Sequence, residues 1–107
     1  MYSVAIAISD DGSYTLVPAV PGRRIRVVNY TIVGDANNNT IQFFSNVTAL
    51  TGIMHITHGN ALVSHAGQLF PAGALMLFQT ATGEPLKLTT TANSGIVGGH
   101  LTYVLVD

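Results

Sequence analysis

The histidines are the side chains in this sequence best suited to metal binding or proton transfer, and there are four of them: His55, His58, His65 and His100. A neutral imidazole is a common zinc ligand, so a cluster of them would predict a metal site. His55 and His58 are three positions apart, however, and an odd separation on a strand places two side chains on opposite faces. No carboxylate or paired-ligand spacing accompanies them. We therefore expect partly exposed histidines with ordinary partners, and no metal or other cofactor.

The acidic residues and serines supply no catalytic constellation either. The sequence contains no nucleophile elbow and no glycine-rich phosphate loop. Asp10, Asp11 and Asp35 lie in the segments DDGS and GDANNNT, which lack the spacing of an EF-hand and have the composition of turns. We interpret these carboxylates as turn-capping groups rather than calcium ligands, and we expect that the protein is not an enzyme.

Positive charge is concentrated in one place, because Arg23, Arg24 and Arg26 make up three of the four lysine and arginine residues. Proteins that bind nucleic acid usually carry a net positive charge, whereas the formal net charge here is −1, so we expect no nucleic-acid partner. Two interpretations remain open. The guanidinium groups pair with carboxylates across a protein interface, where arginine is favoured over lysine, or they belong to a solvated strand face.

These arginines lie in the segment PGRRIRVVNYTIV, which has the strongest strand pattern in the sequence. Its composition is dominated by β-branched and aromatic residues, as in a half-buried strand. In its first half Ile25 and Val27 share one face, and Arg24 and Arg26 share the other. The alternation weakens from Val27 onward, so we expect the second half of the strand to be covered on both faces, the outer one by another sheet or by another subunit. We also expect this strand to occupy a central position in its sheet.

Turn signals divide the rest of the chain into short apolar segments, and no segment has a sustained helical period. Eight or nine short strands of this kind predict an all-β fold, either a sandwich or a barrel, in a single domain covering residues 1–107. The expected strands are Ser3–Ser9, Tyr14–Val20, Pro21–Val33, Ile41–Phe44, Ile53–Thr57, Ala61–His65, Ala74–Gln79, Leu86–Thr90 and Ile96–Val106.

Two of these segments alternate clearly enough to assign their faces. In the first, small residues Ala5 and Ala7 share the face opposite to larger apolar residues, so another surface can approach that face closely. In LKLTT, Leu86 and Leu88 are expected to face inward and Lys87 outward.

Proline and glycine predict three local features. Pro18 has no backbone N–H to donate, so its strand should lie at an edge or contain a bulge. The segment Thr80–Pro85 has the composition of a hairpin connection. Gly98–Gly99, inside the last strand, predicts a bulge, a bend or a close approach of two backbones.

The composition predicts association with other proteins. Hydrophobic residues make up 48% of the chain and charged residues 8%, against about 25% charged residues in typical soluble domains. We expect an oligomer or a component of a larger assembly; the alternative is a monomer with a polar, uncharged surface. The sequence has no cysteine, and its N-terminal segment lacks the features of a signal peptide. No run of 18 apolar residues is present, so we expect no membrane partner.

Five segments, taken in order, carry a resemblance to a known class of proteins: PGRRIRVVNYTIV, an asparagine-rich loop, TIQFFSNVTALTG, LFQTATGEPLKLTT and SGIVGGHLTYVLV. This order resembles small β-rich virion proteins of tailed bacteriophages, namely capsid cement or decoration proteins and related head and tail accessory proteins. ATGEPLKL and GGHLTYVLV carry the resemblance best.

The resemblance implies an antiparallel β-sandwich of the jelly-roll type with about eight strands. It also implies a homotrimer that binds the major capsid protein on the outer capsid surface, after synthesis in the host cytoplasm, and stabilises the capsid. Such proteins have no catalytic residues. Our candidate interface positions lie in the first strand, in the arginine strand and in the loop that follows it: Ala5, Ala7, Arg24, Arg26, Asp35, Asn37, Asn38 and Asn39.

A phage tail or tail-tip module that binds a host receptor or glycan is the alternative function. It requires exposed aromatic side chains beside Asn and Asp in a groove. The sequence offers Tyr2, Tyr14, Tyr30 and Tyr103 for this purpose and has no tryptophan, which argues against this alternative.

Overall fold

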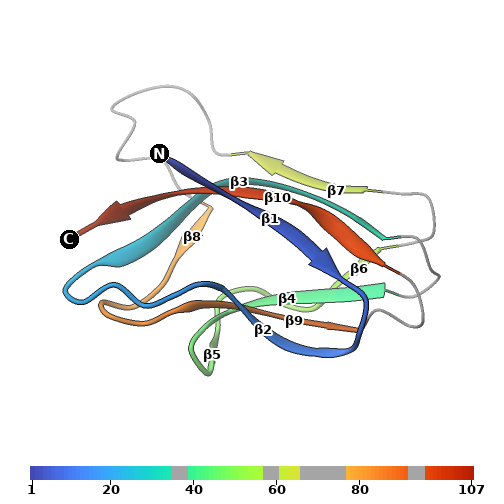
Figure 1. The fold of residues 1–107 in the computed structure, drawn as a ribbon, viewed down its shortest axis with the longest axis horizontal. Coiled ribbons are helices and arrows are strands. Elements are labelled where there is room, and N and C mark those ends of the chain that lie inside the picture. Colours follow the sequence, from blue (N-terminus) through green and yellow to red (C-terminus); the bar gives the residue numbers. More distant parts are fainter. Residues whose placement is uncertain (35–38, 57–60, 66–76, 92–95) are drawn as a thin grey trace.

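The computed structural model describes residues 1–34, 39–56, 61–65, 77–91 and 96–107. These residues form β-strands and no helix (Figure 1). Within the same ranges there is accordingly no helix of the length and apolarity needed to cross a membrane. The strands are β1 (Tyr2–Ile8), β2 (Gly12–Val17), β3 (Arg24–Gly34), β4 (Asn39–Ser45), β5 (Thr48–Ala49), β6 (Met54–Ile56), β7 (Ala61–His65), β8 (Phe78–Gln79), β9 (Leu86–Thr91) and β10 (Val97–Val106).

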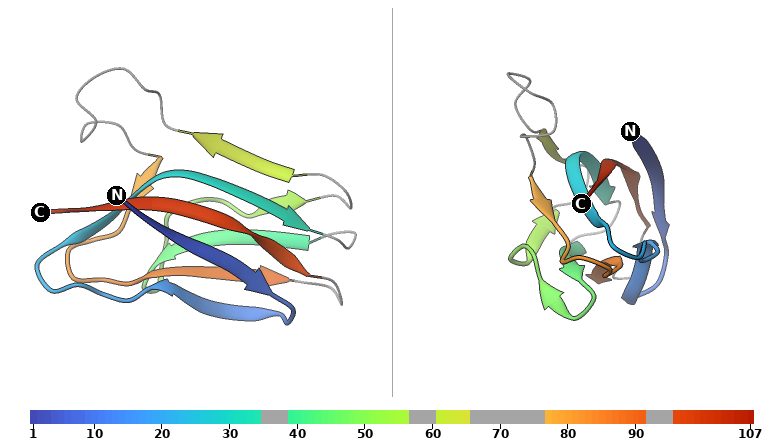
Figure 2. Two further views of the ribbon diagram at one scale, coloured as in Figure 1. Left: turned by 45° about the horizontal axis from the view of Figure 1, so that its top comes forward. Right: turned by 90° about the vertical axis from the view of Figure 1, so that its left-hand side faces the viewer.

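The strands form two antiparallel sheets that pack face to face (Figures 1 and 2). Sheet A has the order β1-β10-β3-β7, with β8 also paired to β3, and sheet B has the order β2-β9-β4-β5, with β6 also paired to β4. When the two-residue strands β5 and β8 are set aside, eight strands remain in the orders β1-β10-β3-β7 and β2-β9-β4-β6. This is the strand order of a jelly roll, a sandwich of two Greek keys. The predicted fold class is confirmed.

The core lies between the two sheets and is built from the inward-facing side chains of both. Ile25 and Val27 of sheet A, and Phe43 and Leu88 of sheet B, have no exposed surface. The ring of Phe43 lies 5.0 Å from that of Phe78, measured between centroids, so an aromatic contact joins the two layers. Each large apolar side chain buried in this way stabilises the fold by about 1.5–3 kcal/mol.

The faces predicted for two strands are confirmed. In β1, Ile6 and Ile8 are buried while Ala5 and Ala7 are exposed. In β9 the two leucines are buried and Lys87 is only partly covered.

β2 behaves as its proline predicts. It ends at Val17, directly before Pro18, and lies at an edge of sheet B. Its register against β9 shifts between Thr15 and Val17, which marks an irregularity near the end of the strand.

β3 lies between β10 and β7, as expected for a central strand, but its inward face changes part-way along. Val27 and Asn29 pair with consecutive residues of β10, which leaves Val28 as the extra residue of a β-bulge. Odd-numbered residues face the core before the bulge, and even-numbered residues such as Ile32 face it afterwards. Val33 is 44% exposed, so no other part of the described chain covers the outer side of the second half, and cover by another subunit stays a prediction. The weakened alternation in the sequence marks the bulge.

Thr80–Pro85 do not connect a hairpin, and that expectation is also wrong. β8 pairs with β3 in sheet A, whereas β9 pairs with β2 and β4 in sheet B, so the connection crosses from one sheet to the other. Hydrogen bonds hold it to both layers. The Thr80 hydroxyl accepts a bond from the Ile25 N–H (2.9 Å) in sheet A, and the Ala81 N–H donates to the Ser45 hydroxyl (2.9 Å) in sheet B.

Of the features predicted for the glycine pair in β10, the structure shows a close approach of two backbones, and it occurs at Gly99. Its φ is +146°, and a Cβ at this position would overlap the carbonyl group of Thr31 on β3. The register between β10 and β3 is regular here. The neighbouring Gly98 has ordinary space, since a Cβ there would lie 3.6 Å from the Ile6 carbonyl oxygen.

Candidate functional site

The surface with the most distinctive chemistry is the side of sheet A that points away from the core. We call it the outer face of sheet A and define it by the residues of β1, β3 and β10 that pair opposite one another on that side. These residues are Ser3, Ala5 and Ala7 of β1, Arg24, Arg26, Asn29, Thr31 and Val33 of β3, and Gly98, His100, Thr102, Val104 and Val106 of β10.

One end of this face is apolar and built from small residues. Ala7 of β1 and Val33 of β3 both lie opposite Gly98 of β10, so these three residues form a row across the sheet. Ala5 lies in the next row, opposite the exposed His100 of β10. Ile96, one residue before β10, is 55% exposed at the same end. Because Ala7 and Gly98 carry no long side chain, a partner surface can approach the sheet closely at this row.

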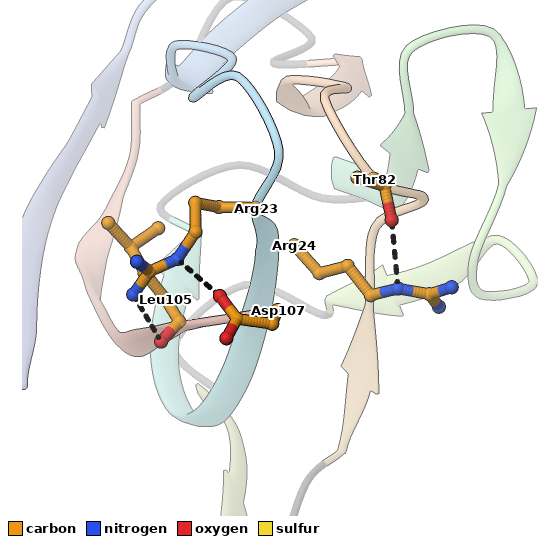
Figure 3. Close-up of polar contacts among 5 residues, drawn as sticks. All are labelled: Arg23, Arg24, Thr82, Leu105 and Asp107. Carbon is orange, nitrogen blue, oxygen red and sulfur yellow. Dashed lines mark hydrogen bonds and ion pairs between the residues drawn. The ribbon is translucent and has the colours of Figure 1, made fainter.

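The other end of the face carries the two arginines. Arg24 donates from Nε to the Thr82 hydroxyl at 3.2 Å (Figure 3), and Arg26 donates from Nε to Gln79 Oε1 at 3.1 Å. Both acceptors are uncharged. Within the ranges that the structure describes, neither guanidinium has a carboxylate within ion-pair distance. The two arginines are thus oriented by neutral neighbours and retain their charge for a partner.

Arg23 differs from them, because it has a carboxylate partner in its own chain. Its Nε lies 3.3 Å from Asp107 Oδ1, and its Nη2 donates to the Leu105 carbonyl oxygen at 3.5 Å (Figure 3). The side chain of Asp107 is 94% exposed, so this ion pair contributes little to stability. The ion pair links Asp107 to Arg23, the residue directly before β3.

The opposite side of the sandwich has a different character. On the outer side of sheet B, Ser13 and Thr15 of β2 lie opposite Thr89 and Lys87 of β9, and Gln42 of β4 also lies opposite Thr89. Hydroxyl, amide and ammonium groups of this kind are well hydrated, and Phe44, opposite Lys87, is the apolar residue among them. The outer face of sheet A differs in combining a row of Ala7, Gly98 and Val33 with two arginines, and we take it as the candidate surface for a protein partner.

The predicted interface residues are partly brought together. Ala5, Ala7, Arg24 and Arg26 come from two strands that are separated in sequence, and they share the outer face of sheet A. Asp35, Asn37 and Asn38 lie outside the described residues. Asn39 is fully buried, and its side chain packs against Gly34 at the end of β3, so its assignment to an interface is corrected. Its carboxamide is a polar group inside the sandwich.

The sequence did not indicate that β10 contributes to this surface. Gly98 and Val104 join the alanines to the arginines only because β10 lies between β1 and β3. The alternating pattern of each strand indicates its two faces, but the pairing decides which faces adjoin.

The histidines and tyrosines are dispersed. His55 lies opposite Thr40 on the outer side of sheet B, whereas His100 lies on the outer face of sheet A. His58 and the side chain of His65 are outside the described part. Among the described residues no three His, Cys, Asp or Glu side chains group as metal ligands. Tyr2 stacks on Tyr103 with ring centroids 5.2 Å apart, and Tyr30 is buried in the core.

Comparison with known proteins returns no match: no family model, no curated protein and no solved structure is similar to this chain at a significant level.

Proposed function

We propose that this protein is a structural subunit that binds the surface of a larger protein shell, as the cement or decoration protein of a tailed-phage capsid does. The observation that carries the proposal is the outer face of sheet A. It combines a closely approachable apolar end with two arginines that have no carboxylate partner among the described residues. The jelly roll is also an architecture of viral structural domains, which supports the comparison with virion proteins.

The mechanism is burial of surface rather than chemistry. Docking of this face removes apolar area from water at about 25 cal/mol per Å², and a standard interface covers about 800 Å² on each partner. Arg24 and Arg26 would fix the orientation of the docked protein, since a guanidinium group binds a carboxylate through two parallel hydrogen bonds. Several subunits in one oligomer bind more tightly than one, because the second contact forms at high effective concentration.

Charge reversal tests this proposal. The double variant Arg24→Glu/Arg26→Glu should lose most of its occupancy on purified particles of the virus that encodes it, measured by cosedimentation and quantitative mass spectrometry. Lys87→Glu on the outer side of sheet B is the matched control and should bind like the unmodified protein. Equal occupancy for both variants would reject the outer face of sheet A as the docking surface. Absence of the protein from the particles would reject the virion role itself.

A further inference from the structure

The free edge of β1 is the least protected strand edge in the described structure. β1 pairs with β10 on one side, and no described strand pairs with its other side (Figure 2). An unpaired edge leaves the N–H and C=O groups of alternate residues available to another strand. The seven residues of β1, YSVAIAI, include no charged residue, no proline and no glycine.

The other sheet edges are irregular or are divided between shorter strands. β2 has a register shift and is followed directly by Pro18. The far edge of sheet B is divided between β5, with two residues, and β6, with three residues. The far edge of sheet A is divided between β7, with five residues, and β8, with two residues, so each part is shorter than the seven residues of β1. Short strands, bulges and proline are the usual means of blocking an edge, and β1 has none of them.

We propose that β1 pairs with β1 of a second copy of this chain, antiparallel and around a twofold axis at Ala5. In this register Ala5 lies opposite itself, Val4 lies opposite Ile6 of the second copy, and all seven residues are used. Residues directly opposite in an antiparallel pair point to the same side, so the core-facing row and the Ser3–Ala5–Ala7 row both continue across the axis.

A second copy is the occupant that fits this edge best. At a twofold axis each residue meets its own equivalent, and like charges directly opposite one another are destabilising. β1 presents no charge to its equivalent, and Ala5 is small enough to face itself without a clash. The net charge of −1 also opposes the approach of two copies only weakly.

The proposed contact fixes the number of copies in the assembly and has a functional consequence. The contact is isologous and consumes both β1 edges, so it closes at two copies and replaces the threefold assembly that the resemblance implied. The two A sheets become continuous, and their outer faces point the same way. The dimer does not depend on the proposed docking to a shell, but it would present two docking faces side by side.

Solution mass tests the dimer. The unmodified protein should have twice the 11.2 kDa mass of one chain at micromolar concentration, by light scattering and native mass spectrometry. Ala5→Lys should lose the dimer, because two ammonium groups would meet at the axis. Val33→Lys adds the same charge to the same face on a central strand and should remain a dimer. Circular dichroism checks that both variants keep the fold.

A disulfide tests the register. The chain has no cysteine, so any disulfide in Ala5→Cys joins two copies. Opposed Cα atoms in an antiparallel pair lie about 4.5–5.5 Å apart, which a disulfide spans. Ala5→Cys should therefore cross-link on oxidation, and Thr31→Cys on β3 should not. A monomer, a trimer, a Val33→Lys variant that dissociates, or a dimer without the cross-link would each overturn the proposal.

Discussion

Two adjacent glycines in β10 have different roles. Gly99 occupies a conformation that side chains with a Cβ rarely adopt, and it lies against the Thr31 carbonyl group. Gly98 has no such constraint. A single residue at this point sets how closely β10 can run beside β3.

Substitution of each glycine by alanine should separate these roles. Gly99→Ala is expected to lower the free energy of unfolding by roughly 2–4 kcal/mol, because it adds both backbone strain and a steric overlap. Gly98→Ala should stay within about 1 kcal/mol of the unmodified protein, since alanine restricts the unfolded chain more than glycine does. Chemical denaturation measures both values. Equal losses for the two variants would contradict this assignment.

At the scale of elements, the connection between β8 and β9 joins the two sheets through hydrogen bonds to both. Thr80 is 1% exposed and bonds both backbone groups of Ile25: its hydroxyl accepts from the Ile25 N–H, and its N–H donates to the Ile25 carbonyl oxygen at 3.0 Å. The next residue, Ala81, bonds to Ser45 of sheet B. A hairpin would not make contacts to both layers.

Removal of the Thr80 hydroxyl tests this connection. Thr80→Val keeps the shape of the side chain but leaves the Ile25 N–H without its acceptor, which should cost about 1–3 kcal/mol of unfolding free energy. Thr80→Ser keeps the hydroxyl and loses one methyl group, so its loss should be smaller, about 0.8 kcal/mol. Thermal and urea unfolding compare the two. A valine variant as stable as the unmodified protein would show that the hydroxyl is not needed there.

At the scale of the whole molecule, the two proposals combine in the geometry of the dimer. Pairing through β1 would place two outer faces of sheet A on one surface. A bivalent protein of this kind binds a repeating surface more tightly than its single faces do, by a factor of about 10²–10⁴ when both can engage.

The Ala5→Cys variant allows this gain to be measured without a new charge. Its oxidised, covalently joined dimer should dissociate from particles much more slowly than the reduced protein at a concentration low enough for the reduced dimer to separate. Dissociation after dilution can be followed by sedimentation or surface plasmon resonance. Equal rates would indicate that the two faces do not bind the same shell together.

Much of the architecture follows from local pattern. A strand has a period of two, so alternating residues are enough to assign Ala5 and Ala7 to one face of β1 and Lys87 to the outer side of β9. Turn residues and the lack of a helical period were enough to predict an all-β fold, either a sandwich or a barrel. These signals act between residues that are close in sequence, and they need no knowledge of the partner strand.

Partner choice and register, in contrast, depend on contacts between distant segments, and the tertiary structure alone decided them. The bulge at Val28 exposes Val33, and the crossover after β8 places Thr80 between the sheets. Asn39 looks like a loop residue in the sequence, yet it is buried beside Gly34. The outer face of sheet A exists because β10 pairs with both β1 and β3, and no local pattern specifies which strands will adjoin.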